Sequence, residues 1–454
     1  MSTATYPDRW QRLGGRWSAP GIVDELLRLA ALERAVAHVA AGWAPKVPET
    51  DDKLRLAHGM EAAMARATAL RQQALTLCDR DEDALRAHRA WIEPLRALDL
   101  TGDPSSVVEA LTVEVPAVLL DRYERLAARI DPLYDARLGA ILEAARRELS
   151  EPGPARAGDL TEALGRALCS EEPPDVALAA VLWGPVDRVG SPARPAGRRR
   201  PEIGARAHFR STSRLEDEDI AADLGDNVIS ELCALELMCR NSYEHPDLEW
   251  PFHLAMARHA SDEARHAAMF QRLLEQRGYD EGTLPQHASN YEYAYSFPEC
   301  APGSERELVW RLLILCTVLE GLAIDKLPLE IATRDTLGQY DIAKALDYAS
   351  ADELFHAENG LRWSRILCHK LELDPMIERE RVHGRFFGRQ RDCRQQYLEA
   401  DPERARREIE ILARPDPDGM AFESRTEVEL RRRASFTIEE CEQVDRWGYN
   451  PAPG

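Results

Sequence analysis

The pattern of apolar and polar positions predicts α-helices along almost the whole chain. Residues 22 to about 183 carry apolar side chains at intervals of three and four, which places them on one face of a helix. The same period returns near residue 213 and continues to about 372. No stretch alternates between apolar and polar residues for long enough to build a sheet, so the sequence predicts an all-α fold.

Segments without a helical period divide the chain into four predicted parts. A stretch rich in Pro, Gly and Arg, residues 184–212, follows an N-terminal helical domain, residues 1–183, and is typical of a solvated linker. Residues 213–372 form two helical hairpins joined by a long connection, residues 279–304. This connectivity is typical of a ferritin-like four-helix bundle. A more charged helical extension, residues 373–454, ends the chain.

Charged residues interrupt two of the most apolar helical segments, and they do so with the same pattern. The pattern Glu-x-x-His occurs three times in the chain, at Glu263/His266, Glu353/His356 and Glu380/His383. The pattern alone carries little weight, and the third copy lies in an Arg-rich stretch that favours a solvated helix face. The first two copies lie in segments that otherwise have the character of buried helices, where an unpaired charge is costly.

Matched spacings distinguish these two copies further. Glu231 precedes Glu263 by almost the same interval as that by which Glu320 precedes Glu353. The midpoint of each interval falls in a predicted turn. Because residues equidistant from the turn of a helical hairpin face each other, each hairpin is expected to place a glutamate opposite a Glu-x-x-His pair. Glu236 is an alternative to Glu231 as the ligand from its helix, although the matched spacing favours Glu231.

Four carboxylates and two imidazoles are therefore predicted to meet in the bundle core. The expected metal ligands are Glu231, Glu263, His266, Glu320, Glu353 and His356. This is the ligand set of di-iron and di-manganese carboxylate proteins. Hard carboxylate oxygens with one imidazole per metal suit iron or manganese better than a structural zinc. The alternative is a bundle without metal, in which the core carboxylates pair with arginine.

Neighbouring residues are candidates for supporting roles at this site. Asp262 and Asp352 each precede a motif glutamate and could accept a hydrogen bond from the histidine of the opposite helix, which would fix its tautomer. His259 shares a helix face with Glu263 and is either a group that supports the metal ligands or a core histidine. Cys316 and Thr317 lie one turn before Glu320 and could border an oxygen cavity, although ordinary core packing accounts for them more simply.

The motifs also resemble those of known families. The stretch "DEARH" resembles the motif of hydroxylase subunits in bacterial multicomponent monooxygenases, within the ferritin-like di-iron carboxylate superfamily. The stretches "SELCALEL", "VLEGLAIDKLP" and "DELFHAENGLRW" resemble more closely a bacterial ferritin-like family of unknown function, the domain-of-unknown-function 455 type. That family is distantly similar to the hydroxylase that acts on isopentenyladenosine in tRNA. The resemblance covers roughly residues 225–370.

The resemblance implies a centre of two iron ions, Fe/Fe or Fe/Mn, held by the six ligands, with O2 as co-substrate. Phe355 stands where the monooxygenase pattern has arginine, which puts regulation by a component protein in doubt. The N-terminal region is similar to a degenerate ferritin-like half, with "AAMAR" (62–66) in place of an acidic, His-bearing motif. Glu33, His58 and Glu61 are too few for a second dimetal site. We interpret this domain as a packing, dimerisation or substrate-covering unit.

Composition limits the classes of partner. The formal net charge of −21 at pH 7 disfavours binding to nucleic acid. The nine cysteines are scattered without a Cys-x-x-Cys pair, which is typical of reduced thiols in the cytoplasm and excludes a rubredoxin-type relay. The N-terminal stretch lacks a signal-peptide pattern, and the most apolar run, residues 312–319, is too short to span a membrane. We expect a cytoplasmic protein.

Three functions are consistent with the sequence. The first is an O2-dependent oxidoreductase, a hydroxylase or oxygenase of a small organic or peptide substrate with an external electron donor. The second is a ferroxidase or peroxide-detoxifying protein, which the length of the chain and the missing Cys-x-x-Cys relay disfavour. The third is a non-catalytic helical interaction protein, which the intact ligand set disfavours. The sequence identifies neither the substrate nor the electron donor.

Overall fold

The fold is described from a computed structural model of the full chain. The described residues are 19–77, 86–87, 89–131, 135–150, 159–168, 176–177, 182–183, 185, 192–195, 217–279, 291, 294, 297–400 and 426–447. Within them the regular secondary structure is helical apart from one two-residue strand pair, in which β1 (Arg86–Ala87) runs antiparallel to β2 (Val176–Ala177). The predicted all-α fold is confirmed.

The chain divides into two compact units. Unit 1 comprises Met1–Val189 and Cys239–Ser261, and unit 2 comprises Gly190–Met238 and Asp262–Gly454. Most of the predicted linker, residues 184–212, lies outside the described residues. Arg194 is among the described residues of this segment. We expected a solvated linker, but Arg194 is buried. Within the described part of the chain, none of the helices combines the length and apolar character that spanning a bilayer requires.

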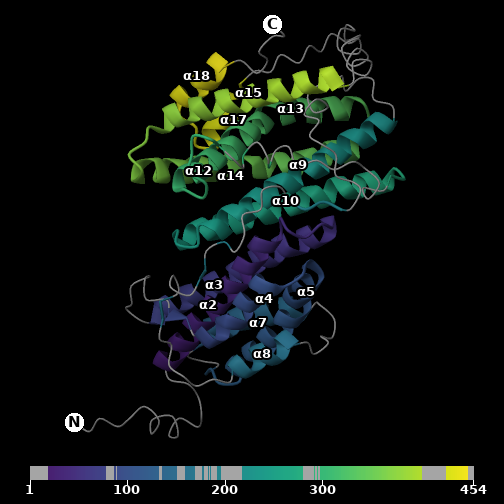
Figure 1. Ribbon diagram of the computed structural model, residues 1–454. Helices are drawn as coiled ribbons and strands as arrows, with labels where there is room; N and C mark the ends of the chain where they lie inside the picture. Colours follow the sequence, from purple (N-terminus) through teal and green to yellow (C-terminus); the bar gives the residue numbers. More distant parts are fainter. Residues whose placement is uncertain are drawn as a thin grey trace, which may run out of the picture. The chain divides into compact units, whose positions relative to one another are not determined.

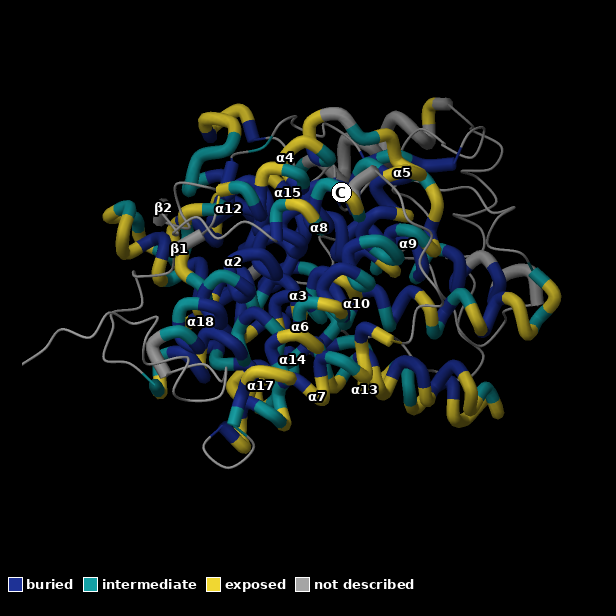
Figure 2. The backbone as a smooth tube through the Cα atoms, turned by 90° about the horizontal axis from the view of Figure 1, so that it is seen from below, coloured by how far each residue is buried: buried dark blue, intermediate teal, exposed yellow. Residues whose placement is uncertain are grey.

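Unit 1 is built on a helical hairpin. Its first helices are α2 (Ala19–Trp43) and α3 (Thr50–Leu77), which pack against each other. Shorter helical segments follow: α4 (Arg89–Thr101), α5 (Pro104–Glu109), η2 (Ala110–Glu114), α6 (Val115–Ala127), α7 (Ala136–Ser150) and α8 (Asp159–Leu168). Because α2 is apolar around most of its circumference, it is buried along nearly its whole length (Figure 2).

Two long helices open the part of the chain that carries the predicted ligands. They are α9 (Asp217–Glu244) and α10 (Trp250–Gln276), joined by a short turn. Their turn-side ends, residues 239–261, are counted with unit 1, and the remainder of both helices belongs to unit 2. The predicted hairpin turn inside "YEHPDLEW" is found where expected.

The second hairpin of unit 2 begins with an irregular helix. Ser304 caps α12 (Glu305–Leu312) by accepting a hydrogen bond from the backbone N–H of Glu307. The chain then passes through a π-helical turn, η6 (Leu313–Leu319), into α13 (Glu320–Thr336) and returns in α14 (Tyr340–Lys370). Helices α13 and α14 pack along each other (Figure 1).

The C-terminal extension packs onto this second hairpin. It comprises α15 (Pro375–Ala400), α17 (Val428–Arg433) and α18 (Ile438–Trp447). Phe436 and Cys441 share an apolar cluster with Ile324 of α13 and Leu361 of α14. Arg431 is buried beside the same helix, where it forms an ion pair with Asp325. The extension is therefore part of the core around α13, rather than an appended tail.

Candidate metal centre

The predicted ligands come together from four helical segments. Glu231 lies on α9, Glu263 and His266 on α10, Glu320 at the start of α13, and Glu353 and His356 on α14. The i and i+3 spacing of each Glu-x-x-His pair brings both side chains to one helix face. All but Glu231, whose side chain is 19% exposed, are buried.

Two overlapping groups of potential ligand atoms form the centre. In one group, atoms of Glu231, Glu263 and His266 lie within 4.8 Å of one another. In the other group, the same limit holds for atoms of His259, Glu263, Glu320 and His356. Glu263 belongs to both groups and so connects them.

The two histidines point the same ring nitrogen at the carboxylates. His266 Nδ1 lies 3.1 Å from Glu263 Oε2 and 3.9 Å from Glu231 Oε2. His356 Nδ1 lies 3.3 Å from Glu263 Oε1 and 3.3 Å from Glu353 Oε2. Both Nδ1 atoms therefore face the space among the glutamates, so each could serve as a metal ligand there.

The opposite ring nitrogens face the two aspartates, and the pairing crosses between helices. His266 Nε2 on α10 lies 3.1 Å from Asp352 Oδ2 on α14. His356 Nε2 on α14 lies 3.4 Å from Asp262 Oδ2 on α10. This is the opposite-helix arrangement that the sequence predicts for the residue before each motif glutamate. It holds the proton on Nε2 and leaves Nδ1 available to a metal.

Arg265 joins the two aspartates, a role that the sequence analysis did not assign. Its guanidinium pairs with Asp352 and lies 3.3 Å from Asp262. The signal was present within the motif "DEARH", because Asp262 and Arg265 are neighbours on a helix surface. The partner on α14 could not be inferred from local spacing. Arg265 thus links α10 to α14 through the two aspartates.

Burial and crowding raise the pKa of two of the carboxylates. Burial and the charge of Glu263 raise the pKa of Glu231 to about 8. Burial and the charge of Glu320 likewise raise the pKa of Glu353 well above its ordinary value. Four ionised glutamates are therefore unfavourable together unless a cation joins them.

The surrounding groups are held in their charged forms. Burial alone would lower the pKa of His266, but hydrogen bonds with Asp352, Glu231 and Glu263 raise it to about 12. Burial would raise the pKa of Asp352, yet hydrogen bonds from His266 and Arg265 lower it to about 2. Asp352 is therefore negatively charged, whereas Glu231, Glu353 and His266 hold protons that a metal ion would displace.

The donor set fits a hard divalent metal ion. Carboxylate oxygens and imidazole nitrogens are ligands that iron and manganese accept. Ligand atoms within 4.8 Å of one another are close enough to share a small ion. Burial and neighbouring carboxylates raise the pKa of Glu231 and Glu353, and such ions would neutralise the carboxylate charge.

Glu236, the alternative ligand on α9, serves a different purpose. It is fully buried, and its carboxylate forms a two-pronged ion pair with Arg194, with N–O distances of 2.5 and 3.1 Å. Neither group of potential ligands includes it. The five positions from Glu231 to Glu236 turn the helix by about 140°, so the two carboxylates point to different sides of α9.

The π-helical turn positions Glu320. The turn η6 ends at Leu319, and Glu320 follows directly as the first residue of α13. Cys316 and Thr317, the candidates for an oxygen cavity, are buried inside this turn, and Thr317 Oγ1 donates to the carbonyl of Leu313. π-Helical turns within longer helices occur frequently at functional sites. A role at an oxygen cavity stays a prediction for both residues.

A glycine allows α14 to approach this turn closely. A Cβ atom at Gly360 would lie 2.0 Å from Cys316 Cβ, so only glycine fits this position. Gly360 lies one helical turn after His356, and Cys316 lies one turn before Glu320. The close contact therefore sets the separation of two ligand-bearing segments one turn away from their ligands.

The third Glu-x-x-His pair stays outside the centre. Glu380 on α15 is exposed and accepts a hydrogen bond from Gln443, and His383 packs against the ring of Phe387. No group of potential metal ligands found among the described residues contains either side chain. The pattern alone is therefore not sufficient for a place in the centre.

Comparison with known proteins identifies a family. The sequence profile of the family described as "Protein of unknown function (DUF455)" matches residues 163–406, more than half of the chain. No curated protein and no solved structure matches the chain. The matched region contains every residue of both ligand groups and ends before α17 and α18. The protein with this buried His/Glu centre is thus a member of the DUF455 family.

Proposed function

We propose that the protein is a ferritin-like dimetal oxidoreductase that uses O2 to hydroxylate or oxidise a small organic or peptide substrate. The proposed metal pair is Fe/Fe or Fe/Mn. The proposed ligands are the six residues predicted from the sequence: Glu231, Glu263, His266, Glu320, Glu353 and His356. An external donor supplies the electrons.

One observation carries this proposal. Three carboxylates and three imidazoles, all buried except the half-buried Glu231, form two groups of potential ligands, and Glu263 lies in both. Burial of so many like charges costs free energy that a structural role does not require. A fold that retains such a cost is typical of a site that binds metal ions.

The chemistry divides between the metals and the protein. When bound, a reduced pair of iron ions supplies electrons and open coordination positions for O2. The protein provides carboxylates that offset the metal charge and histidines held in one tautomer by Asp262 and Asp352. Burial of Glu263, His266 and His356 limits the access of water to the centre.

Metal content tests the proposal most directly. Protein from cells supplied with iron and manganese is expected to contain about two metal ions per chain by elemental analysis. Glu263→Ala and Glu353→Ala are expected to lose most of this metal. Glu380→Ala is the matched control, because it removes the glutamate of the exposed third motif, and it is expected to retain full metal content.

Oxygen uptake then separates an oxidoreductase from a passive metal site. The iron-loaded protein, reduced with dithionite and freed of excess reductant, is expected to consume O2 in a single turnover. Glu353→Ala is expected to consume little. A wild-type protein without bound metal would overturn the proposal, and metal-loaded protein that is inert towards O2 would exclude the oxidoreductase function. Consumption of added ferrous iron in many turnovers would favour a ferroxidase instead.

A further inference from the structure

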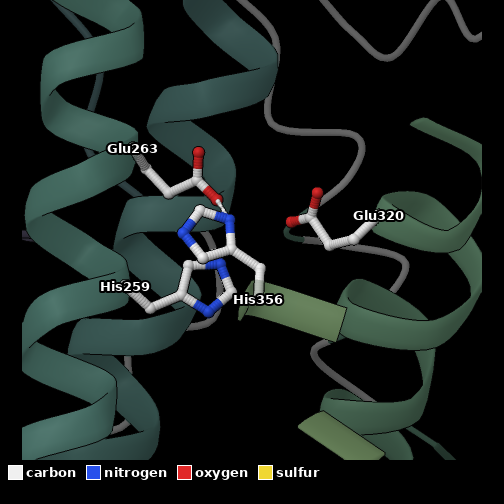
Figure 3. Close-up of side chains that lie close together, drawn as sticks. All are labelled: His259, Glu263, Glu320 and His356. Carbon is white, nitrogen blue, oxygen red and sulfur yellow. Dashed lines mark ion pairs between the residues drawn. The ribbon is translucent and has the colours of Figure 1, made fainter. Parts of the chain in front are cut away.

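His259 lies among the potential metal ligands themselves, rather than behind one of them. It precedes Glu263 by one turn on the uninterrupted helix α10, so both side chains emerge from the same helix face. It is fully buried, and one of its ring nitrogens lies within 4.8 Å of potential ligand atoms on Glu263, Glu320 and His356. Figure 3 shows its ring beside that of His356, with Glu263 and Glu320 pointing toward the same region.

The centre is consequently asymmetric in its nitrogen donors. The group around His266 contains one imidazole with Glu231 and Glu263. The group around His356 contains two imidazoles with Glu263 and Glu320. The two Glu-x-x-His pairs are equivalent in sequence, and the difference arises from His259, which has no counterpart one turn before Glu353, where Ala349 stands.

We infer that His259 is a metal ligand, so that one of the two metal positions has two imidazole donors and the other has one. This inference rests on the proposed dimetal function and specifies its ligand set. An imidazole is a softer donor than a carboxylate and carries no negative charge. The position with His259 therefore holds a divalent ion with less ligand charge, and the two positions differ in metal affinity and in preference.

Two consequences follow for metal loading. Divalent ions that bind nitrogen well, such as Co²⁺, are expected to fill the position with His259 first. Mn²⁺, which favours oxygen donors, is expected to discriminate less between the two positions. The ligand set therefore favours a pair of different metal ions, in which the ion that binds nitrogen more strongly occupies the position with His259.

The test uses the full chain loaded with Co²⁺ alone. A histidine that binds a paramagnetic ion through one ring nitrogen keeps a proton on the other, and that proton gives a shifted, exchangeable signal in the proton NMR spectrum. The wild-type protein with two Co²⁺ per chain is expected to show three such signals, from His259, His266 and His356. His259→Gln is expected to show two signals and at least about tenfold weaker binding of one Co²⁺.

His253→Gln is the matched control on the same helix. His253 is also buried on α10, but its ring contacts Ser242 and the carbonyl of Leu248. This variant is expected to keep all three shifted signals and both binding steps. It separates loss of a ligand from a general disturbance of α10, which would affect both variants.

The possible results distinguish the two proposals. Two shifted signals in a wild-type protein that binds two Co²⁺ would refute the role of His259 and leave the dimetal function intact. Binding of no Co²⁺ would remove the proposed function itself. Three signals in His259→Gln would also overturn the inference, because the third signal would then come from another histidine.

Discussion

The two units solve the same electrostatic problem in different ways. Each buries a glutamate of a helical hairpin, Glu33 on α2 in unit 1 and Glu320 on α13 in unit 2. In unit 1, Arg66 lies 2.8 Å from both oxygens of Glu33, and Tyr123 donates to the same carboxylate. In unit 2, further carboxylates approach instead of a guanidinium.

The spacing makes this comparison closer. The interval along the chain from Glu33 to Arg66 equals the interval from Glu320 to Glu353. The arginine is part of "AAMAR", the stretch that stands where an acidic, His-bearing motif is expected in a degenerate copy. In unit 1 a side-chain cation therefore occupies the position across the hairpin that belongs to a ligand in unit 2. In unit 1 the arginine neutralises the buried glutamate permanently, which suits a structural core. In unit 2 the crowded carboxylates can instead be neutralised by a metal ion that binds and dissociates.

Buried histidines follow the same division. Burial and the positive charge of Arg34 lower the pKa of His38 in unit 1 to about 3. In unit 2, burial opposes protonation of His266, but the aspartate and glutamates around it raise its pKa to about 12. The same residue type is held neutral in one unit and positive in the other because its nearest charges have opposite signs.

The largest effect is expected from breaking the internal pair of unit 1. Arg66→Ala leaves Glu33 buried without its cation, which should reduce the free energy of unfolding by about 3–5 kcal/mol. Urea denaturation followed by tryptophan fluorescence measures this change. Replacing both partners, as Glu33→Leu with Arg66→Met, should recover most of the loss. A decrease below about 1 kcal/mol in Arg66→Ala would contradict the structural role of the pair.

Metal ions should stabilise the protein through the candidate metal centre and not through the Glu33–Arg66 pair. Mn²⁺ at about one hundred times its dissociation constant is expected to raise the free energy of unfolding by about 2.7 kcal/mol per independent site. The increase should be absent in Glu263→Ala and present in Arg66→Ala, whose change lies in unit 1. Thermal unfolding with and without Mn²⁺ measures it. Equal stabilisation of the wild type and Glu263→Ala would place the metal elsewhere.

Adding a methyl group at Gly360 should disturb the spacing of the ligands on α13 and α14. Gly360→Ala forces a methyl group against Cys316, which should cost about 1–3 kcal/mol and weaken metal binding by α14. Gly384→Ala in α15 is the matched control, because nothing lies within 4 Å of the added methyl group. That control should be neutral or slightly stabilising. Unfolding and metal titration of both variants check the expectation, and equal behaviour would contradict it.

The last effect comes from the histidine of unit 1 and is expected only at acidic pH. Because the folded protein lowers the pKa of His38 to about 3, the unfolded chain binds its proton more readily below about pH 6.5. Neutral His38 therefore contributes fully to the free energy of unfolding above that pH. This contribution decreases by about 1.4 kcal/mol for each pH unit below it. His253, whose pKa is also lowered, acts in the same direction.

Urea denaturation at several pH values tests this dependence. His38→Gln removes one titrating group, so the slope of stability against pH below about 6.5 should decrease by roughly one proton. A variant with the slope of the wild type would show that His38 does not control the acid response of unit 1.

The sequence by itself determined the helices and most of the candidate centre. Helical period is local, and the i and i+3 spacing of Glu-x-x-His fixes a shared helix face without knowledge of the rest of the fold. The matched intervals from Glu231 to Glu263 and from Glu320 to Glu353 added the one long-range relation that an antiparallel hairpin makes predictable. These relations were sufficient to choose Glu231 and to set aside the third motif.

Only the tertiary structure decided which charges are neutralised by the protein itself. Arg194, expected in a solvated linker, is buried against Glu236, and Arg431 from the C-terminal extension reaches Asp325, which lies far away in the sequence. Such pairs follow from how helices pack, and no local spacing encodes them. Whether His259 is a core histidine or lies among ligands was open for the same reason, because its surroundings come from α13 and α14. Local geometry selects a helix face, and packing selects what that face meets.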